Sequence, residues 1–294
     1  MTTQTKKLAI FDPTDRIESE KGILIKDLFE KIEGVTTEIF AVKYNHFPIE
    51  NNPLSLEVVD ADLEKNGKKS KVGEGKHPPV DAVLNYLTKN YDGLVIGGNN
   101  DHQVDDDTQE YFDTLYPLMN ELIKIDYPVL GICWGAQAIM RALHGDDALA
   151  KMTAVGKEPQ IGVLKYTVIK KGNPLFEGVS DDFYSLSFHK ACFIIADPSA
   201  KIICSRDGYW DNQAFQFKKK RCFGVQFHPE HTLASSTKTF NKFKSLSAKD
   251  KGDFANSSLI YDKEAPDEDQ GKKIAQNFLN IIDTSSFEAV PISV

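Results

Sequence analysis

The chain has 294 residues, of which 41% are hydrophobic and 27% are charged, so it can bury a substantial core and is not disordered as a whole. Its formal net charge of −8 argues against partners such as nucleic acid or an anionic membrane surface, which call for basic patches. The apolar run near the N-terminus is too short for a signal peptide or a spanning helix, so we expect a cytoplasmic protein. The 4 cysteines contain no CxxC pair and are expected to be free thiols.

The first half of the chain alternates apolar, β-branched runs with amphipathic ones. Strands joined through helices by short connections predict parallel βαβ units, and therefore an α/β fold around a parallel central sheet. In chain order we expect a strand at 7–11, a helix at 22–32, a strand at 36–44, a helix at 80–87, a strand at 91–96, a helix from Asp107 or Thr108 to about 125, and a strand at 129–132 that leads into a helix at 136–143.

The second half is richer in strands, which turn signals such as Lys171-Gly-Asn-Pro174 separate. Two polar stretches interrupt the pattern. We interpret residues 49–80 and 232–271 as surface insertions in a single domain that spans 1–294. The expected elements are strands at 163–169, 183–188, 192–196, 201–204 and 222–227, and a last helix at 273–282.

The stretch Pro128-Val-Leu-Gly-Ile-Cys133-Trp-Gly-Ala-Gln137 joins a short apolar strand to a helix through a cysteine. Glycines two residues before and two after Cys133 permit the tight turn of a nucleophile elbow, which lifts the thiol clear of the sheet. The dipole of the following helix lowers the pKa of such a thiol from its free value of roughly 8.5. The alternative is a buried structural cysteine, a common role for free cysteines.

A cysteine nucleophile needs a base that holds it as the thiolate, and a third group that orients the base. His228 and Glu230 follow the expected strand at 222–227. Because the carboxyl ends of parallel strands meet at one edge of a sheet, both residues are expected near Cys133. Pro229 stiffens the connection, so the carboxylate can turn back onto the imidazole. The alternative for His228 is an ordinary loop histidine.

Neither of two candidate metal sites has the required pattern, so no metal or other cofactor is expected. His228 and His231 lack the spacing of a helical HExxH site, and no Cys/His cluster lies nearby in the sequence. The acidic residues between Asp101 and Asp107 lack the central glycine and the terminal glutamate of a calcium-binding loop. We interpret them as a solvated helix start.

The pair Gly97-Gly98 ends the strand that precedes the elbow by one βα unit. Acyl chemistry at a thiolate develops an oxyanion, which backbone N–H donors stabilise, and loss of one donor costs roughly 10²–10³ in rate. Glycines let the backbone approach closely, so Gly98 N–H and Trp134 N–H are candidates for the two donors. A Gly-Gly pair alone is most often just a turn.

These three blocks, Gly-Ile-Cys133-Trp-Gly-Ala-Gln137, Gly-Val-Gln-Phe-His228-Pro-Glu230 and the strand that ends in Gly97-Gly98, together resemble the class I (triad) glutamine amidotransferases. The resemblance implies a three-layer α/β/α fold of flavodoxin-like type with a mainly parallel central sheet. It implies that Cys133 attacks a glutamine or γ-glutamyl side-chain amide, and that His228 helps water to clear the thioester.

The resemblance also assigns substrate contacts. Gln137 falls where the family holds the glutamine, and the backbone at Lys190 and Ala191, just after His189, falls where the α-amino and α-carboxylate groups are clasped. The loop after Gly98 departs from the family pattern, since it continues Asn-Asn-Asp in place of Pro and small residues. Because no synthetase domain follows, any ammonia acceptor is expected to be a separate synthetase subunit.

Two other functions fit parts of the pattern. Ile-Cys133-Trp-Gly-Ala-Gln-Ala138 also resembles the elbow of homoserine O-acyltransferases, which use a Cys-His-Glu set on a related fold. A partner-binding module that retained the fold without catalysis is the third interpretation. Such modules usually lose a triad residue, and none is lost here.

Overall fold

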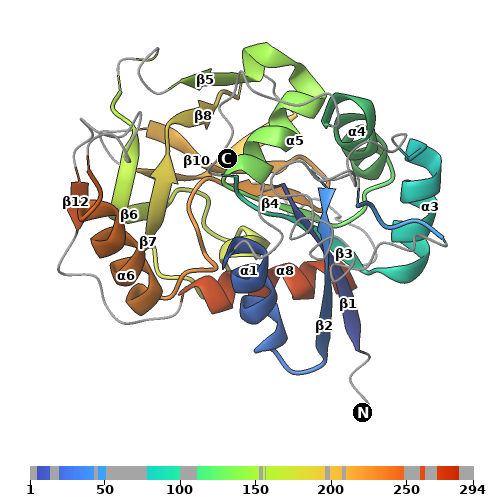
Figure 1. The fold of residues 1–294 in the computed structure, drawn as a ribbon, viewed down its shortest axis with the longest axis horizontal. Coiled ribbons are helices and arrows are strands. Elements are labelled where there is room, and N and C mark those ends of the chain that lie inside the picture. The colour runs from blue at the N-terminus through green and yellow to red at the C-terminus, as the bar shows by residue number, and fades with distance from the viewer. Residues whose placement is uncertain are drawn as a thin grey trace.

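The structure is a computed structural model that describes residues 5–13, 20–42, 46–50, 78–99, 111–151, 155, 157–195, 199–206, 210–247, 259–261 and 270–284. Within these ranges the strands form one ten-stranded sheet and a small two-stranded sheet, with helices on both faces of the large one (Figure 1). The expected helix start at Asp107 or Thr108, the acidic cluster and most of the stretch 49–80 lie outside the described residues.

One half of the large sheet is parallel, as expected. Its strands, in spatial order, are β2 (Val35–Ala41), β1 (Lys6–Asp12), β3 (Gly93–Ile96), β4 (Val129–Ile132) and β11 (Cys222–Val225). Successive residues of a strand face opposite sides of the sheet, so in β1 Leu8 and Ile10 enter one apolar cluster whereas Ala9 and Phe11 enter the other.

Helices cover both faces of this parallel half, and this confirms the expected three layers (Figure 1). One face carries α3 (Val80–Asn90), α4 (Tyr116–Lys124) and α5 (Trp134–His144), and a π-helical turn at Tyr111–Leu115 leads into α4. The opposite face carries α1 (Glu20–Glu30) and α8 (Gln270–Asp283). Parallel strands buried on both faces are typical of such folds.

The other half of the sheet is mixed. Beyond β11 follow β10 (Trp210–Phe217), β9 (Ala200–Arg206), β6 (Gln160–Val168) and β12 (Leu259–Tyr261), and β7 (Asp182–His189) also pairs with β6. Pairing is antiparallel throughout except between β6 and β12. The small sheet joins β5 (Leu149–Lys151) to β8 (Ala191–Phe193), and short 3₁₀ turns lie at Asp146–Ala148 and Pro174–Phe176.

Strand β10 was not expected, because polar residues interrupt its apolar pattern. In the structure these polar groups find partners on neighbouring segments. Asn173 Nδ2 donates to Gln216 Oε1 over 2.7 Å, and Asn212 Nδ2 donates to the Phe193 carbonyl over 3.1 Å. Such partners offset the cost of burying amide groups, and local sequence does not reveal them.

The polar stretch after residue 232 contains a further helix, α6 (Leu233–Lys244), which the sequence analysis did not predict. Its many Ser, Thr and Lys residues mask two apolar anchors, Phe240 and Phe243, which are buried. Phe243 packs edge-on against Phe188 of β7, with ring centroids 5.1 Å apart. Thr232 caps the helix by accepting a hydrogen bond from Ser235 N.

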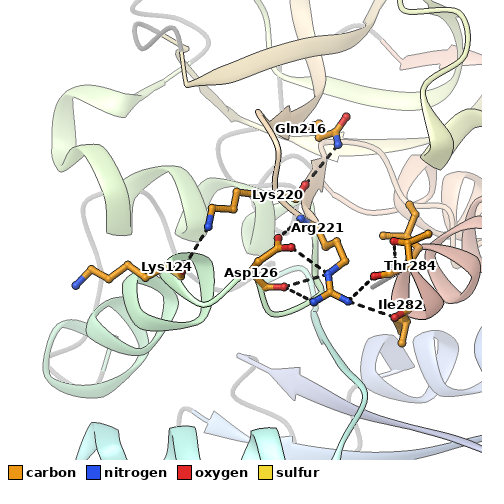
Figure 2. A network of polar contacts seen from close by, with 8 residues as sticks. Lys124, Asp126, Gln216, Lys220, Arg221, Ile282 and Thr284 are labelled. Atoms are coloured by element: carbon orange, nitrogen blue, oxygen red, sulfur yellow. Dashed lines mark hydrogen bonds and ion pairs between the residues drawn. The ribbon is translucent and has the colours of Figure 1, made fainter. Parts of the chain in front are cut away.

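A polar network holds together the beginnings of β4 and β11 (Figure 2). The Arg221 guanidinium donates from Nη2 to the Asp126 carbonyl over 2.7 Å and from Nη1 to the carbonyls of Ile282 and Thr284, at the end of α8. The backbone N–H of Arg221 donates to Asp126 Oδ1 over 2.7 Å. The network thus braces the register of the two strands that lead to Cys133 and His228.

Candidate active site

Cys133 lies between β4 and α5 in a conformation that side chains rarely adopt, with φ 53° and ψ −108°. The carbonyl of Cys133 accepts from the N–H groups of Ala136 and Gln137, so the helix begins at once. A Cβ on Gly131 would lie 2.6 Å from the carbonyl carbon of Gly135, and one on Gly135 would lie 2.2 Å from Ile96 O. The two glycines therefore permit the tight elbow that the sequence predicted.

The parallel pairing of β4 with β11 sets where the base lies relative to the cysteine. Ile132 pairs with Val225, and the Cys133 N–H donates to the Val225 carbonyl over 2.7 Å. His228 follows Val225 by three residues, and the Cys133 sulfur is close enough to raise the pKa of its imidazole. The structure thus brings the predicted nucleophile and base together at the carboxyl edge of the sheet.

His228 and Glu230 form a buried pair, with 2.6 Å between Nδ1 and Oε1. Burial by itself lowers the pKa of His228, but the Glu230 carboxylate and then the Cys133 sulfur outweigh it and hold this pKa above its ordinary value. Burial likewise tends to raise the pKa of Glu230, and the imidazolium outweighs it, so the pKa of Glu230 is lowered. Both directions describe an imidazolium–carboxylate pair.

The backbone of His228 is held by β7. Its N–H donates to the Leu186 carbonyl over 2.9 Å, and its carbonyl accepts from Ser185 Oγ over 3.2 Å. With Nδ1 engaged by Glu230, Nε2 remains the ring atom for proton transfer, and among the described residues it has no hydrogen-bond partner of ordinary geometry. This arrangement fixes the orientation of the imidazole, as a general base requires.

The sulfur of Cys133 has two further contacts. The thiol donates to the Phe188 carbonyl, at the end of β7, over 3.9 Å, and Gln226 Nε2 donates to the sulfur over 3.6 Å. Gln226 lies within the motif before His228, but the sequence analysis assigned it no role. Its position next to a base motif was the only signal, because nothing local shows which way a strand-end side chain points.

The substrate contacts implied by the resemblance lie near the sulfur, but several of their polar groups bond to each other. Gln137 is buried, and its Nε2 donates to the Ala191 carbonyl over 3.0 Å and to Gln226 Oε1 over 3.1 Å. His189 Nδ1 lies 2.8 Å from the same Ala191 carbonyl. Ala191 is buried and Lys190 is half-buried, so the carbonyl of Ala191 faces inward.

Gly97 and Gly98 lie beside the elbow, because Ile96 pairs with Gly131 of β4. The N–H of Gly97 donates to the Phe11 carbonyl over 2.9 Å, which leaves Gly98 as the candidate oxyanion donor from this loop. Trp134 is the first residue of α5, where N–H groups have no acceptor within the helix. Asn99, the first departure from the family pattern, anchors the loop by donating to the Pro13 carbonyl over 3.0 Å.

Within the described residues no cluster of three or more metal-binding side chains occurs. His231 lies edge-on to His228 with ring centroids 5.9 Å apart, and its Nδ1 is 3.3 Å from Ser235 Oγ. In the same part of the chain, no helix has the length and apolar character needed to span a membrane.

The chain belongs to the class-I glutamine amidotransferases, since residues 55–246 match the family described as "Glutamine amidotransferase class-I". It is 33% identical over 110 residues to the glutamine-hydrolysing GMP synthase of Caldanaerobacter subterraneus subsp. tengcongensis, a match that covers 37% of this chain and spans only 20% of that enzyme's length. It is 28% identical over 167 residues to one named subunit of the glutamine-hydrolysing GMP synthase of Methanobrevibacter smithii, covering 54% of this chain and 78% of its relative.

A third relative is the homoserine O-succinyltransferase of Shewanella piezotolerans, 30% identical over 142 residues, which covers 46% of this chain and 41% of that protein. Among solved structures, a glutamine amido transferase from Methylobacillus flagellatus superposes with a TM-score of 0.60 at 15% identity and covers 98% of this chain and 99% of its own. A glutamine amidotransferase from Thermotoga maritima gives 0.58 at 16% identity, with 96% and 100% covered. These structures confirm the predicted fold class.

Proposed function

We propose that this chain hydrolyses the side-chain amide of glutamine, or of a γ-glutamyl compound, through a thioester on Cys133. His228 acts as general base and acid, and Glu230 orients it. The observation that carries the proposal is the buried contact of 2.6 Å between His228 Nδ1 and Glu230 Oε1, on a strand that pairs directly with the one leading to Cys133. A buried, oriented imidazole beside an elbow cysteine is the arrangement that covalent amide hydrolysis requires.

The reaction proceeds in two halves. The Cys133 thiolate attacks the amide carbonyl carbon, the carbon–nitrogen bond breaks, and the His228 imidazolium gives its proton to the leaving nitrogen, which departs as ammonia or an amine. Neutral His228 then takes a proton from water, the resulting hydroxide attacks the thioester, and the carbon–sulfur bond breaks. The products are a free carboxylate and the regenerated cysteine. Gly98 N–H and Trp134 N–H are our candidates for the donors to the oxyanion formed in each half.

The decisive experiment compares glutamate release from glutamine by the native protein and by Cys133→Ala. We expect amide hydrolysis to vanish in the variant while its circular dichroism spectrum stays native. An electrophilic glutamine analogue should label Cys133 in the native protein. Hydrolysis that persists in Cys133→Ala would refute the proposal. A native protein that neither hydrolyses glutamine nor takes the label would favour a non-catalytic module.

Homoserine acyl transfer is the second candidate, and the similarity to a homoserine O-succinyltransferase favours it. Both reactions use an acyl-enzyme on a cysteine, so the acyl donor and acceptor distinguish them. We expect no acyl transfer from an acyl-CoA to homoserine under conditions where glutamine is hydrolysed. Efficient transfer without hydrolysis would reverse this ranking.

We also propose that a separate synthetase subunit takes up the ammonia. The support is that the relatives include proteins named as one subunit of a GMP synthase and as component 2 of an anthranilate synthase. Co-purification from the native cell, with glutaminase activity measured with and without the co-purified protein, tests this. The single-domain organisation remains part of the proposal, supported by one sheet that runs through the described strands.

A further inference from the structure

A glutamine that the reaction outlined above does not use contacts the sulfur of Cys133. Gln226 directly follows β11, is fully buried, and donates from Nε2 to the sulfur over 3.6 Å. Its backbone N–H donates to the Gln213 carbonyl of β10 over 2.8 Å, so the residue is held by the sheet on the side away from the elbow. The side chain therefore has a fixed place beside the thiol.

A chain of contacts that ends on a backbone carbonyl decides which end of the Gln226 amide faces the sulfur. The Ala191 carbonyl can only accept, so the group of Gln137 that lies 3.0 Å from it must be the NH₂ group. The second proton of this NH₂ group is donated to Gln226 Oε1 over 3.1 Å. Because the oxygen of Gln226 faces Gln137, its nitrogen must face Cys133.

His189 strengthens this anchor. Its Nδ1 lies 2.8 Å from the same Ala191 carbonyl and must donate to it. Burial lowers the pKa of His189 to about 3, so the ring is neutral at the pH values at which the enzyme would work. Two donors on one carbonyl hold both the carbonyl and Gln137 in place without placing a charge near the thiol.

We propose that Gln226 stabilises the Cys133 thiolate through this N–H donor, and that Gln137 is a positioning residue that orients Gln226. A donor favours the charged form of the group that accepts its hydrogen bond, and a thiolate accepts far better than a thiol. The opposing contact is the Phe188 carbonyl, 3.9 Å from the sulfur, which can bond only to the protonated thiol. The donor on the other side tips this balance toward ionisation.

This inference rests on the proposed function only in taking Cys133 as the nucleophile, and it predicts an effect before any substrate binds. A residue that only contacts glutamine would change KM and leave the free enzyme unaltered. A residue that orients the thiolate donor changes the reactivity of Cys133 in the free enzyme. Measurements without glutamine therefore separate the role proposed for Gln137 from a substrate contact.

The experiment measures the rate at which iodoacetamide alkylates Cys133 in the full chain between pH 5 and 10, without glutamine, with the modified cysteine identified by mass spectrometry. Cys192, Cys204 and Cys222 are buried, so their slower modification can be subtracted with Cys133→Ala. The variants are Gln226→Met, which keeps the size but removes the donor, and Gln137→Met, which removes the group that orients it. The matched control is Gln216→Met on β10, whose amide contacts Asn173 and Lys220.

For Gln226→Met we expect an apparent thiol pKa about one unit higher, and hence about tenfold slower alkylation at neutral pH. Gln137→Met should shift it in the same direction by less, because the freed amide of Gln226 samples both orientations, and Gln216→Met should match the native protein. A native pH profile in Gln226→Met would overturn the proposal. If that variant does not fold, a native profile in Gln137→Met overturns it instead. The profile is read without turnover, so it stands or falls separately from glutamine hydrolysis.

Discussion

Gly271 in α8 lies directly against the carbonyl of Pro229, the residue between His228 and Glu230. A Cβ on Gly271 would come within 1.9 Å of Pro229 O, and this O is backbone, which cannot rotate away. The first turn of α8 therefore braces the short segment that carries the base and its orienting carboxylate. Such close approach is open only to glycine.

We accordingly expect Gly271→Ala to displace that segment. A shift of about 1 Å in a reacting group costs on the order of 10²-fold in rate, and overpacking costs about 1–3 kcal/mol of stability. Glutamine hydrolysis and urea unfolding measure the two effects. Gln276→Ala, an exposed change in the same helix, is the control and should alter neither by much. Native kinetics in Gly271→Ala would show that the segment does not depend on the helix.

The backbone of Cys133 holds strain that glycine would relieve. With φ 53° and ψ −108°, a residue with a Cβ costs of order 1–3 kcal/mol there. Glycine ordinarily destabilises relative to alanine by about 0.5–1 kcal/mol. At this position we expect the reverse, with Cys133→Gly as stable as Cys133→Ala or up to about 1 kcal/mol more stable in urea unfolding. In the control pair at Cys222 of β11, the glycine variant should be the weaker one.

The His228–Glu230 pair makes stability depend on pH in a defined window. The pKa of Glu230 is lowered from its ordinary 4.5, so its contribution is present above that value and is lost as the pH falls. The pKa of His228 is raised above its ordinary 6.5, so its contribution is full below 6.5 and is lost as the pH rises through the raised value. The pair should stabilise most between these two ordinary values.

Glu230→Gln should therefore cost most near pH 5.5, on the order of 3–5 kcal/mol for a broken buried pair, and less at pH 4 and at pH 9. Urea unfolding at the three pH values measures this difference. Glu177→Gln, at an exposed position, should stay within about 0.5 kcal/mol of the native protein. A cost for Glu230→Gln that is the same at every pH would mean that the pair is not ionised in the folded protein.

Arg221 contributes to stability through the shape of its side chain as well as its charge. Its guanidinium reaches carbonyls of both Asp126 and Thr284, which the single amine of a lysine cannot do at once (Figure 2). Arg221→Lys should cost about 1–3 kcal/mol in urea unfolding. The exposed change Lys218→Ala should be close to neutral. An Arg221→Lys variant as stable as the native protein would show that charge alone is sufficient.

The amino-acid sequence by itself determined the parallel half of the sheet, its helices and the elbow, because each depends on the spacing of apolar residues and glycines within a few positions. The neighbouring strand ends also placed His228 and Glu230 near Cys133, since parallel strands present their carboxyl ends at one edge. The family resemblance is confirmed by the match over residues 55–246. The catalytic roles stay predictions that the proposed variants test.

Only the tertiary structure decided what the polar side chains contact. Strand β10 and helix α6 escaped prediction because their polar residues hide the apolar pattern and are satisfied by distant partners. Gln226 meets a sulfur 93 positions away in the chain, and Gly271 meets a carbonyl from another segment. Hydrogen bonds and close packing between remote segments have no local spacing rule, so they follow from the fold and cannot be read from the order of residues.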